Sequence, residues 1–503
     1  MPQTPPASGG RTDTRTADLT GPIEPLAASD TTFDATTDVV VVGLGVAGCS
    51  ATLAARQAGG DVLAIERGPS SGGTSANSGG LIYLGGGTAL QRACGFEDSV
   101  ENMAAFLHAA LGHDADHERI DEYCVGSPDH FDWLVANGVP FRAALCTEPN
   151  RESADDAGLL FSGGEDSWPF DEVARPVPRG HKPQWVDSAG GFFMRCLGDA
   201  VTQSGATLAT DARVTRLVVD DQTIVGVQFQ DDDGMRTVRA RGGVVLAAGG
   251  FINNDAMVAQ HCPTAHRPNP AWRVGTPTDD GRGIRLGLGV GAHARRLEAF
   301  ECALPLGPPH RLARAILVNR RGERFVNEDT YTGRIGLRAL VDQQGDVFMI
   351  TDDVIHERNI VGLRVNAAAA TAEELAHDIG LPPDALARTV ADYNAAAARG
   401  EDPQFHKRPP FLQPIGVPPA SGIGAIDLGV DRDAIYATFT LGGLATDADG
   451  RVLGEDGCPR PGLFAAGRTS ASLAARDYVS GISLGDGSFF GRRAGTLAAR
   501  SAR

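Results

Sequence analysis

A glycine-rich turn that follows a short apolar run constrains the fold of this chain more than any other feature. The run VVVV at residues 39–42 has the composition of a parallel strand that is buried on both faces. The sequence GLGVAG at 43–48 comes directly after it, and a helical stretch follows over 49–57. A strand, a GxGxxG turn and a helix in this order predict the start of an α/β fold that binds a dinucleotide.

The three glycines of this turn have different tasks. Gly43 permits the tight turn, Gly45 lets the backbone approach a pyrophosphate, and Gly48 lets the helix and the strand pack closely. The free amides at the start of the helix, at Val46 and Ala47, together with the positive end of the helix dipole, would hold the phosphates.

An acidic residue follows at the distance that such a site requires. A second strand over 61–65 ends at Glu66 and Arg67, and Glu66 lies 18 residues after Gly48. This is the position of the acid that binds the ribose hydroxyls of a dinucleotide. Because a carboxylate there would repel a 2′-phosphate, the dinucleotide is not of the NADP type.

The next segment distinguishes a flavin from a nicotinamide dinucleotide. Residues 72–80 read GGTSANSGG, and a loop of such small residues can wrap a pyrophosphate and a flavin with its backbone amides. Two further buried strands with glycine exits lie far downstream, at 244–251 and 462–468. Strands that return to one sheet from distant sequence imply a domain with a large insertion. The residues of the small-residue loop that we expect to bind the cofactor are Gly73, Thr74, Ser75, Ser78, Gly79 and Gly80.

Charge and cysteine content exclude several classes of protein. The 503 residues include 45 Lys and Arg against 63 Asp and Glu, a formal charge of −18, which makes a nucleic-acid binder a poor candidate. No apolar run approaches the roughly 18 residues that cross a bilayer. None of the eight cysteines is spaced as CxxC or CxxCH, which argues against a zinc knuckle, a cysteine-ligated iron–sulfur cluster and an attached haem. We therefore expect no metal site, reduced and mostly buried thiols, and a cytoplasmic protein.

Three other segments have a distinct composition or spacing. Residues 1–36 are rich in Pro, Thr, Ala and Asp and carry no export signal, so we interpret them as a disordered tail. The stretch 147–190 is rich in Gly, Pro and acidic residues and predicts a long surface loop. The spacing of Leu386, Val390 and Tyr393 predicts a packed helix in which Tyr393 is structural.

Seven motifs in a fixed order resemble those of the fumarate reductase and 3-ketosteroid dehydrogenase flavoproteins. They read GLGVAG, ER, GGTSANSGG, VVLAAGGF, ILVNRRGERFVNED, GLFAAG and SLGDGSFFGRRAG, from about residue 37 to the C-terminus. The resemblance implies FAD and a Rossmann-like FAD-binding domain in two segments, 37–295 and 441–503, with an inserted α+β catalytic cap domain at 296–440. It adds these residues to the expected cofactor contacts: Val214, Ala248, Gly249, Asp280, Gly467, Arg468, Ser483 and Leu484.

The mode of FAD attachment follows from the same resemblance. Members of these families with a covalent flavin carry a histidine in the segment that matches residues 72–80. The sequence GGTSANSGG has no histidine. We therefore expect the FAD to be bound non-covalently.

Two positions argue against a dicarboxylate substrate. Carboxylates pair bidentately with guanidinium groups, and the fumarate reductases carry a substrate-binding arginine before their last flavin helix. Alignment on the shared sequence FGR places Tyr478 at that position. The arginine that follows VNE in their cap also has no match, because Arg334 lies two residues out of register.

Tyrosines in these places suit a neutral, largely apolar ketone. One phenol can donate a hydrogen bond to a carbonyl oxygen and hold the developing enolate. A second phenol can take the proton from the α carbon if its pKa, ordinarily near 10, is tuned by its neighbours. The sequence is most similar to the 3-ketosteroid Δ4-(5α)-dehydrogenases over 318–336 and 480–495, and the catalytic residues of that family carry over to Tyr331, Tyr478 and Ser480. Ser480 would serve as a relay or orienting group.

The chain departs from this family just before the second tyrosine. Arg476 and Asp477 stand at positions where those enzymes have small residues. These two residues place charge close to the expected mouth of the substrate site. The departure bears on the steroid itself more than on the desaturation chemistry.

The resemblance implies the α,β-dehydrogenation of a cyclic ketone, a 3-ketosteroid or a similar polycyclic ketone. Tyr478 would polarise the carbonyl, Tyr331 would take the α proton, and N5 of the flavin would take the β hydrogen as hydride. One alternative is a flavin-dependent ene-reductase of the fumarate reductase type, which saturates an enone or enoate. Another is a non-catalytic FAD scaffold. The lack of haem and iron–sulfur motifs favours oxidation, and the tyrosine pair argues against a scaffold.

The expected partners follow from this chemistry. They are an apolar cyclic ketone and an external electron acceptor that the sequence does not identify. We expect no nucleic acid partner and no transmembrane segment, and we expect a monomer or a small homo-oligomer.

Overall fold

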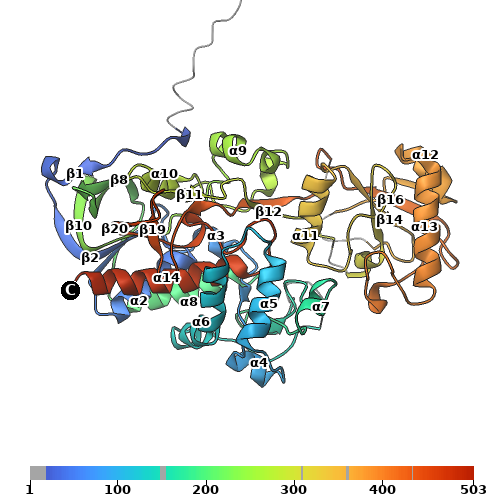
Figure 1. The fold of residues 1–503 in the computed structure, drawn as a ribbon, viewed down its shortest axis with the longest axis horizontal. Coiled ribbons are helices and arrows are strands. Elements are labelled where there is room, and N and C mark those ends of the chain that lie inside the picture. The colour runs from blue at the N-terminus through green and yellow to red at the C-terminus, as the bar shows by residue number, and fades with distance from the viewer. Residues whose placement is uncertain (1–18, 148–153, 307–309, 358–361, 433) are drawn as a thin grey trace, which may run out of the picture.

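Strands that lie far apart in the sequence meet in one large sheet. The structure is a computed structural model that describes residues 19–147, 154–306, 310–357, 362–432 and 434–503. Figure 1 shows an elongated molecule, with this sheet and its helices at one end and the orange elements of the predicted cap at the other.

The large sheet has a parallel centre. Its strands run in the order β1-β8-β9-β10-β2-β3-β7, and β20 pairs with both β10 and β19. β10 is parallel to β2 on one side and to β20 on the other, which confirms the predicted α/β fold. The strands are β1 (Leu26–Ala27), β2 (Ala35–Val42), β3 (Val62–Ile65), β7 (Thr207–Ala209), β8 (Arg213–Asp220), β9 (Thr223–Asp231), β10 (Gly234–Leu246), β19 (Arg451–Leu453) and β20 (Pro459–Ala465).

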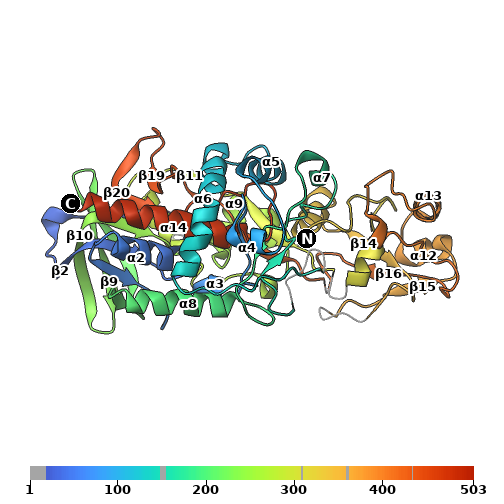
Figure 2. The ribbon, with the colours of Figure 1, turned by 90° about the horizontal axis from the view of Figure 1, so that it is seen from below.

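Glycine and alanine bring the last helix against the first long one. The two helices are α2 (Val46–Gln57) and α14 (Ile482–Ser501). A Cβ atom at Gly491 would lie 2.3 Å from the carbonyl oxygen of Ala47, and one at Gly495 would lie 2.1 Å from that of Ala51. Figure 2 shows α14, α2 and α8 (Gly190–Gln203) side by side. This close contact fixes where α14 begins, and the cavity described below lies at that point.

The prediction of a disordered tail over residues 1–36 is wrong for the part of it that the structure describes. β1 pairs with β8, and the N–H of Ile23 donates to the carbonyl oxygen of Arg285 at 2.9 Å. The described part of the tail, residues 19–36, is therefore packed against the sheet. Its few apolar residues include Ile23, which packs against the hydrophobic core. The high Pro and Thr content had favoured a disordered segment instead. Residues 1–18 lie outside the described residues.

The prediction of a long surface loop over 147–190 is wrong for the described part of that stretch. Its strands β5 and β6 complete a three-stranded sheet with β4, and Arg179 within it is fully buried and paired with Asp98 at 2.8 Å. The acidic and glycine-rich composition reflects buried ion pairs and tight turns. Residues 148–153 lie outside the described residues. The elements around this sheet are α3 (Gly73–Ala76), β4 (Ile82–Tyr83), α4 (Ala89–Ala93), α5 (Val100–Ala110), α6 (His117–Ala136), β5 (Leu159–Leu160), α7 (Phe170–Val173) and β6 (Gly180–His181).

The predicted cap segment, residues 296–440, contains its own sheet of order β13-β14-β16-β15. Its entry strand β12 pairs antiparallel with its exit strand β17. The segment comprises β12 (Phe300–Ala303), β13 (Ile316–Asn319), α11 (Thr332–Leu337), a π-helical turn (Arg338–Asp342), β14 (Val347–Thr351), β15 (Ala367–Ala369), α12 (Ala372–Ile379), α13 (Pro383–Ala397), β16 (Ile423–Asp427) and β17 (Ala437–Thr440). Tyr393 is buried on α13, as the helical spacing predicted. The division of the chain into domains stays a prediction.

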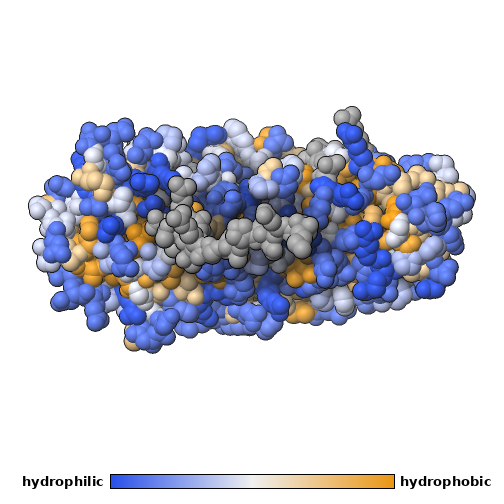
Figure 3. Space-filling model, turned by 90° about the horizontal axis from the view of Figure 1, so that it is seen from above, coloured by the Kyte–Doolittle hydropathy of each residue, from blue (hydrophilic) through white to orange (hydrophobic). Residues whose placement is uncertain are grey.

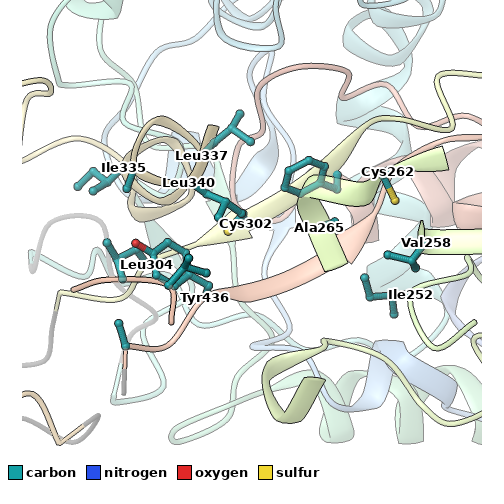
Figure 4. Packing of buried hydrophobic residues seen from close by; sticks show 14 of the residues in the cluster. Ile252, Val258, Cys262, Ala265, Cys302, Leu304, Ile335, Leu337, Leu340 and Tyr436 are labelled. Atoms are coloured by element: carbon teal, nitrogen blue, oxygen red, sulfur yellow. The ribbon is translucent and has the colours of Figure 1, made fainter. Parts of the chain in front are cut away.

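Short elements connect the large sheet to the cap segment and return from it. They are α9 (Asp255–His261), α10 (Arg282–Leu288), β11 (Ala294–Arg295) and β18 (Gly443–Leu444). One hydrophobic cluster runs through both parts of the chain, from the large sheet to the cap sheet. Figure 4 shows the junction, with Ile252, Val258, Cys262 and Ala265 from before the cap segment and Cys302, Leu304, Ile335, Leu337, Leu340 and Tyr436 from within it. The two parts are therefore packed through a continuous apolar core.

One face of the molecule is predominantly polar. Figure 3 shows hydrophilic residues over most of one face, with the hydrophobic ones in small separate areas. In the part of the chain that the structure describes, none of the helices combines the length and the apolar content needed to cross a membrane.

The expectation of mostly buried thiols holds for half of the eight cysteines, since Cys49, Cys124, Cys262 and Cys302 are buried and the other four are not.

A buried network of charges anchors the segment that leads to Tyr331. The Arg324 guanidinium donates to both carboxylate oxygens of Glu328, at 3.0 and 2.7 Å, and to both of Asp402, each at 2.9 Å. Lys407 Nζ lies 3.2 Å from Glu328. Removal of one member would leave buried charge without compensation, which is costly.

We expect Arg324→Met to lower the free energy of unfolding by about 3–5 kcal/mol, because two buried carboxylates lose their main partner. Arg320→Met is the matched control, because Arg320 pairs with Asp346 at the surface, where its side chain is 52% exposed. An exposed pair of this kind contributes about 1 kcal/mol or less. Urea denaturation of both variants measures the difference, and equal losses would contradict the anchoring role.

Candidate functional site

A cavity of about 420 Å³ opens where four parallel strands end. Val42, Ile65, Ala247 and Ala466, at the carboxyl ends of β2, β3, β10 and β20, all line it, as expected for a ligand site in an open α/β sheet. The predicted site residues that line the cavity are Gly43, Gly45, Val46, Ala47, Glu66, Arg67, Gly73, Thr74, Ser75, Ser78, Gly79, Gly80, Val214, Ala248, Gly249, Asp280, Tyr331, Gly467, Arg468, Tyr478, Ser480, Ser483 and Leu484.

Gly48 is the predicted site residue that does not line this cavity. A Cβ atom there would lie 1.8 Å from the carbonyl oxygen of Gly43, inside the contact between helix and strand. Gly43 has a positive φ of 97°, and a Cβ on it would lie 2.5 Å from the carbonyl oxygen of Ala247. Gly45 instead faces the cavity, and the nearest atom to a Cβ there would be Ser75 Oγ at 3.4 Å. The turn therefore exposes backbone at Gly45 and packs at the other two glycines.

Glu66 stands at the end of β3 with its carboxylate held by the backbone. Its Oε2 accepts from the N–H of Leu44 at 2.7 Å, and its Oε1 accepts from the N–H of Gly68 at 2.8 Å. These two bonds fix the carboxylate at the wall of the cavity. A carboxylate held in this way can also accept hydrogen bonds from ribose hydroxyls.

Asp279 is a cavity residue that sequence reasoning missed. Its carboxylate accepts from the Gly250 N–H at 2.6 Å, from Thr74 Oγ1 at 3.2 Å and from Arg468 Nη2 at 2.5 Å. It thus joins the small-residue loop to the glycine exit of β20. The adjacent Asp280, which was predicted, pairs with Arg67 at 2.7 Å. The acidic pair in TPTDDGRG was a visible signal, but no local pattern separates the two roles.

The residues present fit FAD. One end of the cavity has the exposed glycine backbone and the Glu66 carboxylate, which suit phosphates and a ribose. Arg468 lines the cavity, and its buried Nη1 has no hydrogen-bond partner among the residues that the structure describes. A cation in that position can face a phosphate or the flavin. The other end of the cavity is aromatic.

Two tyrosines lie together at this aromatic end. Tyr331 precedes α11 and Tyr478 precedes α14, and their ring centroids are 6.2 Å apart. The Phe439 ring on β17 packs edge-on against Tyr478 at 5.5 Å. The two tyrosines are 147 residues apart in the sequence, and both phenols line one cavity. The sequence predicted this arrangement only through the family resemblance.

The two phenols differ in their hydrogen bonds. Tyr478 Oη accepts from the backbone N–H of Ser483 at 3.2 Å, so its own proton is available to a ligand. Tyr331 Oη instead donates to Oε1 of Glu301 at 2.9 Å. Burial raises the pKa of both phenols above the ordinary value. Since the Ser483 amide is used by Tyr478, a contact between that amide and the flavin stays a prediction.

Glu301 is the second residue that sequence reasoning missed. It is 1% exposed, lines the cavity from β12, and burial raises its pKa to about 8. Phe300 and Cys302 flank it, and both are buried in apolar core clusters or against them. A single acid between apolar residues of a strand was a weak signal, because it belongs to no motif.

The remaining predicted residues have other contacts. Ser480 lines the cavity, and its carbonyl oxygen accepts from Ser162 Oγ at 3.0 Å. Among the residues that the structure describes, no side chain forms a hydrogen bond with the Ser480 hydroxyl. Arg476 and Asp477 do not line the cavity, and Asp477 pairs with Arg338 at 3.1 Å. The expectation that these charges lie close to the mouth of the substrate site stays a prediction.

Comparison with known proteins agrees with this site. Residues 38–484 match the FAD binding domain family. The chain is 44% identical to the 3-ketosteroid Δ4-(5α)-dehydrogenase of Rhodococcus jostii RHA1, whose crystal structure with 4-androstene-3,17-dione matches with a TM-score of 0.89 over 95% of this chain and 100% of that one. It is 27% identical to the 3-oxo-5-alpha-steroid 4-dehydrogenase of Comamonas testosteroni, over 88% of this chain and 94% of that protein.

A third relative is named for a different activity, the reduction of acrylate by NADH. The chain is 30% identical to the NADH:acrylate oxidoreductase of Vibrio harveyi over 94% of its own length. It spans 51% of the length of that relative. A family match over most of the chain, with a cavity that fits the cofactor, decides the assignment. The chain belongs to the FAD-binding domain family of oxidoreductases.

Proposed function

We propose that this protein catalyses the α,β-dehydrogenation of a cyclic ketone, a 3-ketosteroid or a similar polycyclic ketone. The observation that carries the proposal is the pair of phenols at one end of the cavity, of which one has a free proton and the other donates to a carboxylate. The steroid dehydrogenases among the relatives support the substrate class.

The protein groups divide the work on the substrate. When bound, FAD would be the oxidant that accepts the hydrogen of the β carbon as hydride. Tyr478 donates a hydrogen bond to the carbonyl oxygen and stabilises negative charge that develops there. Tyr331 takes the proton from the α carbon. Ser480 lies at the same cavity wall and orients the ketone beside Tyr478.

A reductase that saturates an enone or enoate is the second candidate, favoured by the similarity to the NADH:acrylate oxidoreductase. The same residues would serve the reverse reaction, with Tyr331 as the proton donor. Anaerobic addition of 5α-androstane-3,17-dione and of simple cyclohexanones tests the direction. Bleaching of the flavin absorbance supports the dehydrogenase, whereas reoxidation of reduced enzyme by an enone without any bleaching by ketones supports the reductase. If the flavin responds in neither of these ways, the protein is a non-catalytic FAD scaffold.

We expect the FAD to be released completely by acid precipitation, because residues 72–80 contain no histidine for a covalent bond. The measurement is the flavin absorbance of the supernatant and of the washed pellet. Yellow colour that stays in the pellet would overturn the non-covalent assignment.

Dicarboxylates should be neither substrates nor competitive inhibitors at millimolar concentration. Tyr478 stands where a clamp arginine would be. Arg334 does not line the cavity, and its guanidinium donates to Thr330 Oγ1 at 3.0 Å and lies 4.2 Å from the centre of the Phe170 ring. Fumarate reduction with a reduced dye, at a rate comparable to ketone oxidation, would show that this expectation is wrong.

Tyr331→Phe and Tyr478→Phe should each slow anaerobic flavin reduction by about two orders of magnitude or more, as for loss of a base or an oxyanion donor. Only Tyr478→Phe should weaken binding of 4-androstene-3,17-dione, because the enone keeps the carbonyl and has lost the α proton. Rapid-mixing spectroscopy and ligand titration measure the two effects.

The FAD content of both variants is the control. Each variant keeps its ring, so packing and cofactor binding should stay unchanged. Loss of FAD would mean that the tyrosine is structural, and exchanged effects on enone binding would reverse the two roles.

A further inference from the structure

A carboxyl group stands directly behind the phenol that takes the proton. Glu301 Oε1 is 2.9 Å from Tyr331 Oη, and the phenol donates this hydrogen bond. Both side chains are buried, and both residues line the cavity. If Tyr331 is to accept a proton from carbon, its own proton has to leave, and this carboxyl group is the nearest acceptor.

The backbone makes room for this pair. A Cβ atom at Gly333 would lie 1.9 Å from Glu301 Oε1 and 2.3 Å from Tyr331 Cε1. Gly333 has no positive φ, so only space explains a glycine here. The first turn of α11 therefore accommodates the contact between the carboxyl group and the phenol.

Further buried polar groups interact electrostatically with Glu301. The buried atoms Glu301 Oε2, Arg334 Nε and Asp477 Oδ1 each have no hydrogen-bond partner within the described ranges of the chain. Asp477 pairs with Arg338, which in turn pairs with Asp342 at 3.2 Å. The Arg338 side chain is 41% exposed. Asp477, which acts on the pKa of Glu301, is thus linked through Arg338 to the surface.

We propose that Glu301 is the proton acceptor behind Tyr331, an inference that rests on the proposed ketone dehydrogenation. The bond between the α carbon and its hydrogen breaks, and the proton moves to Tyr331 Oη while the phenol proton moves to Glu301 Oε1. The electron pair of the broken bond forms the double bond to the β carbon. The β hydrogen leaves with its electron pair as hydride to bound FAD. Glu301 then returns its proton to solvent.

The charge state of Glu301 gives the reaction a pH dependence. Five titratable groups interact with it electrostatically: Tyr331, Tyr478, Arg334, Asp477 and the neighbouring Cys302 on β12. Burial raises the pKa of Glu301 to about 8, and Asp477 acts in the same direction, whereas the Tyr331 hydrogen bond and Arg334 act against it. Only the ionised carboxylate can accept a proton. The rate should therefore rise with pH and level off above about 8.

The test compares the wild-type holoenzyme with Glu301→Gln and Glu301→Asp. Anaerobic flavin reduction by 5α-androstane-3,17-dione is followed from about pH 6 to about pH 10. On the plateau we expect Glu301→Gln to be slower by about 10²-fold, as for loss of a base, and to lose the rise near pH 8. Glu301→Asp keeps a carboxyl group and should recover part of the rate.

Glu165→Gln is the matched control. Glu165 is also buried, with a pKa raised to about 7, but its Oε2 accepts from the Gly163 N–H at 2.9 Å, and it has no hydrogen bond to either tyrosine in the described structure. This variant should keep the rise with pH. FAD content of every variant is measured in parallel.

A second measurement isolates the proton transfer. Chemically reduced holoenzyme cannot take hydride, so washout of deuterium from the α carbon of the labelled ketone, followed by NMR, reports α-proton removal alone. Glu301→Gln should slow this exchange by about the same factor as flavin reduction.

The outcomes separate this inference from the proposed function. Wild-type enzyme that neither oxidises nor exchanges the ketone overturns both. Wild-type activity with an equally fast Glu301→Gln variant, or with an unchanged pH profile in that variant, overturns the role of Glu301 alone. Slow exchange and a lost pH rise in Glu301→Gln, with normal FAD content, establish it.

Discussion

Contact between backbone and backbone, with no side chain in between, sets the geometry on which the rest of this structure depends. Gly43 and Gly48 let the first turn close onto the strand end at Ala247, and Gly491 and Gly495 let α14 lie directly on α2. A Cβ atom at any of these glycines would meet a backbone oxygen, which cannot rotate aside as the tip of a long side chain can. The turn that would hold the phosphates and the start of α14 are therefore placed by one rigid unit.

The aromatic end of the cavity combines residues next to this rigid unit with residues of the cap segment. Tyr478 lies just before α14 and Ser483 lies in its first turn, whereas Glu301 and Tyr331 come from the cap side. The hydrophobic cluster that continues from the large sheet into the cap sheet holds the two contributions together. The residues that would hold the cofactor and the Glu301–Tyr331 pair thus come from different parts of the chain, and a continuous apolar core joins these parts.

Local patterns were sufficient for the features that are themselves local. The apolar run before Gly43, the acid at Glu66 and the small-residue loop led to a parallel sheet and to a set of residues that the structure brings to one cavity. Asp279 and Glu301 were not predicted as site residues, because the groups around them come from distant segments of the chain. Glu301 and Tyr331 are 30 residues apart in the sequence and meet because α11 packs against β12. The composition of 147–190 misled for the same reason, since the partner of Arg179 is Asp98, on another element.

The register between the entry and exit strands of the cap segment has a consequence for how this enzyme can vary. Glu301 and Phe439 are directly opposite each other in the antiparallel pair of β12 and β17. The acid behind Tyr331 and the ring against Tyr478 thus belong to the stem of the insertion and not to its body. In the described structure, the strands of the cap sheet do not pair with either strand of this stem, so that sheet could be lengthened or shortened without a change in the strand pairing that holds the two residues. A lineage could remodel its outer surface, and with it the molecules it meets, while it inherits the same stem unchanged.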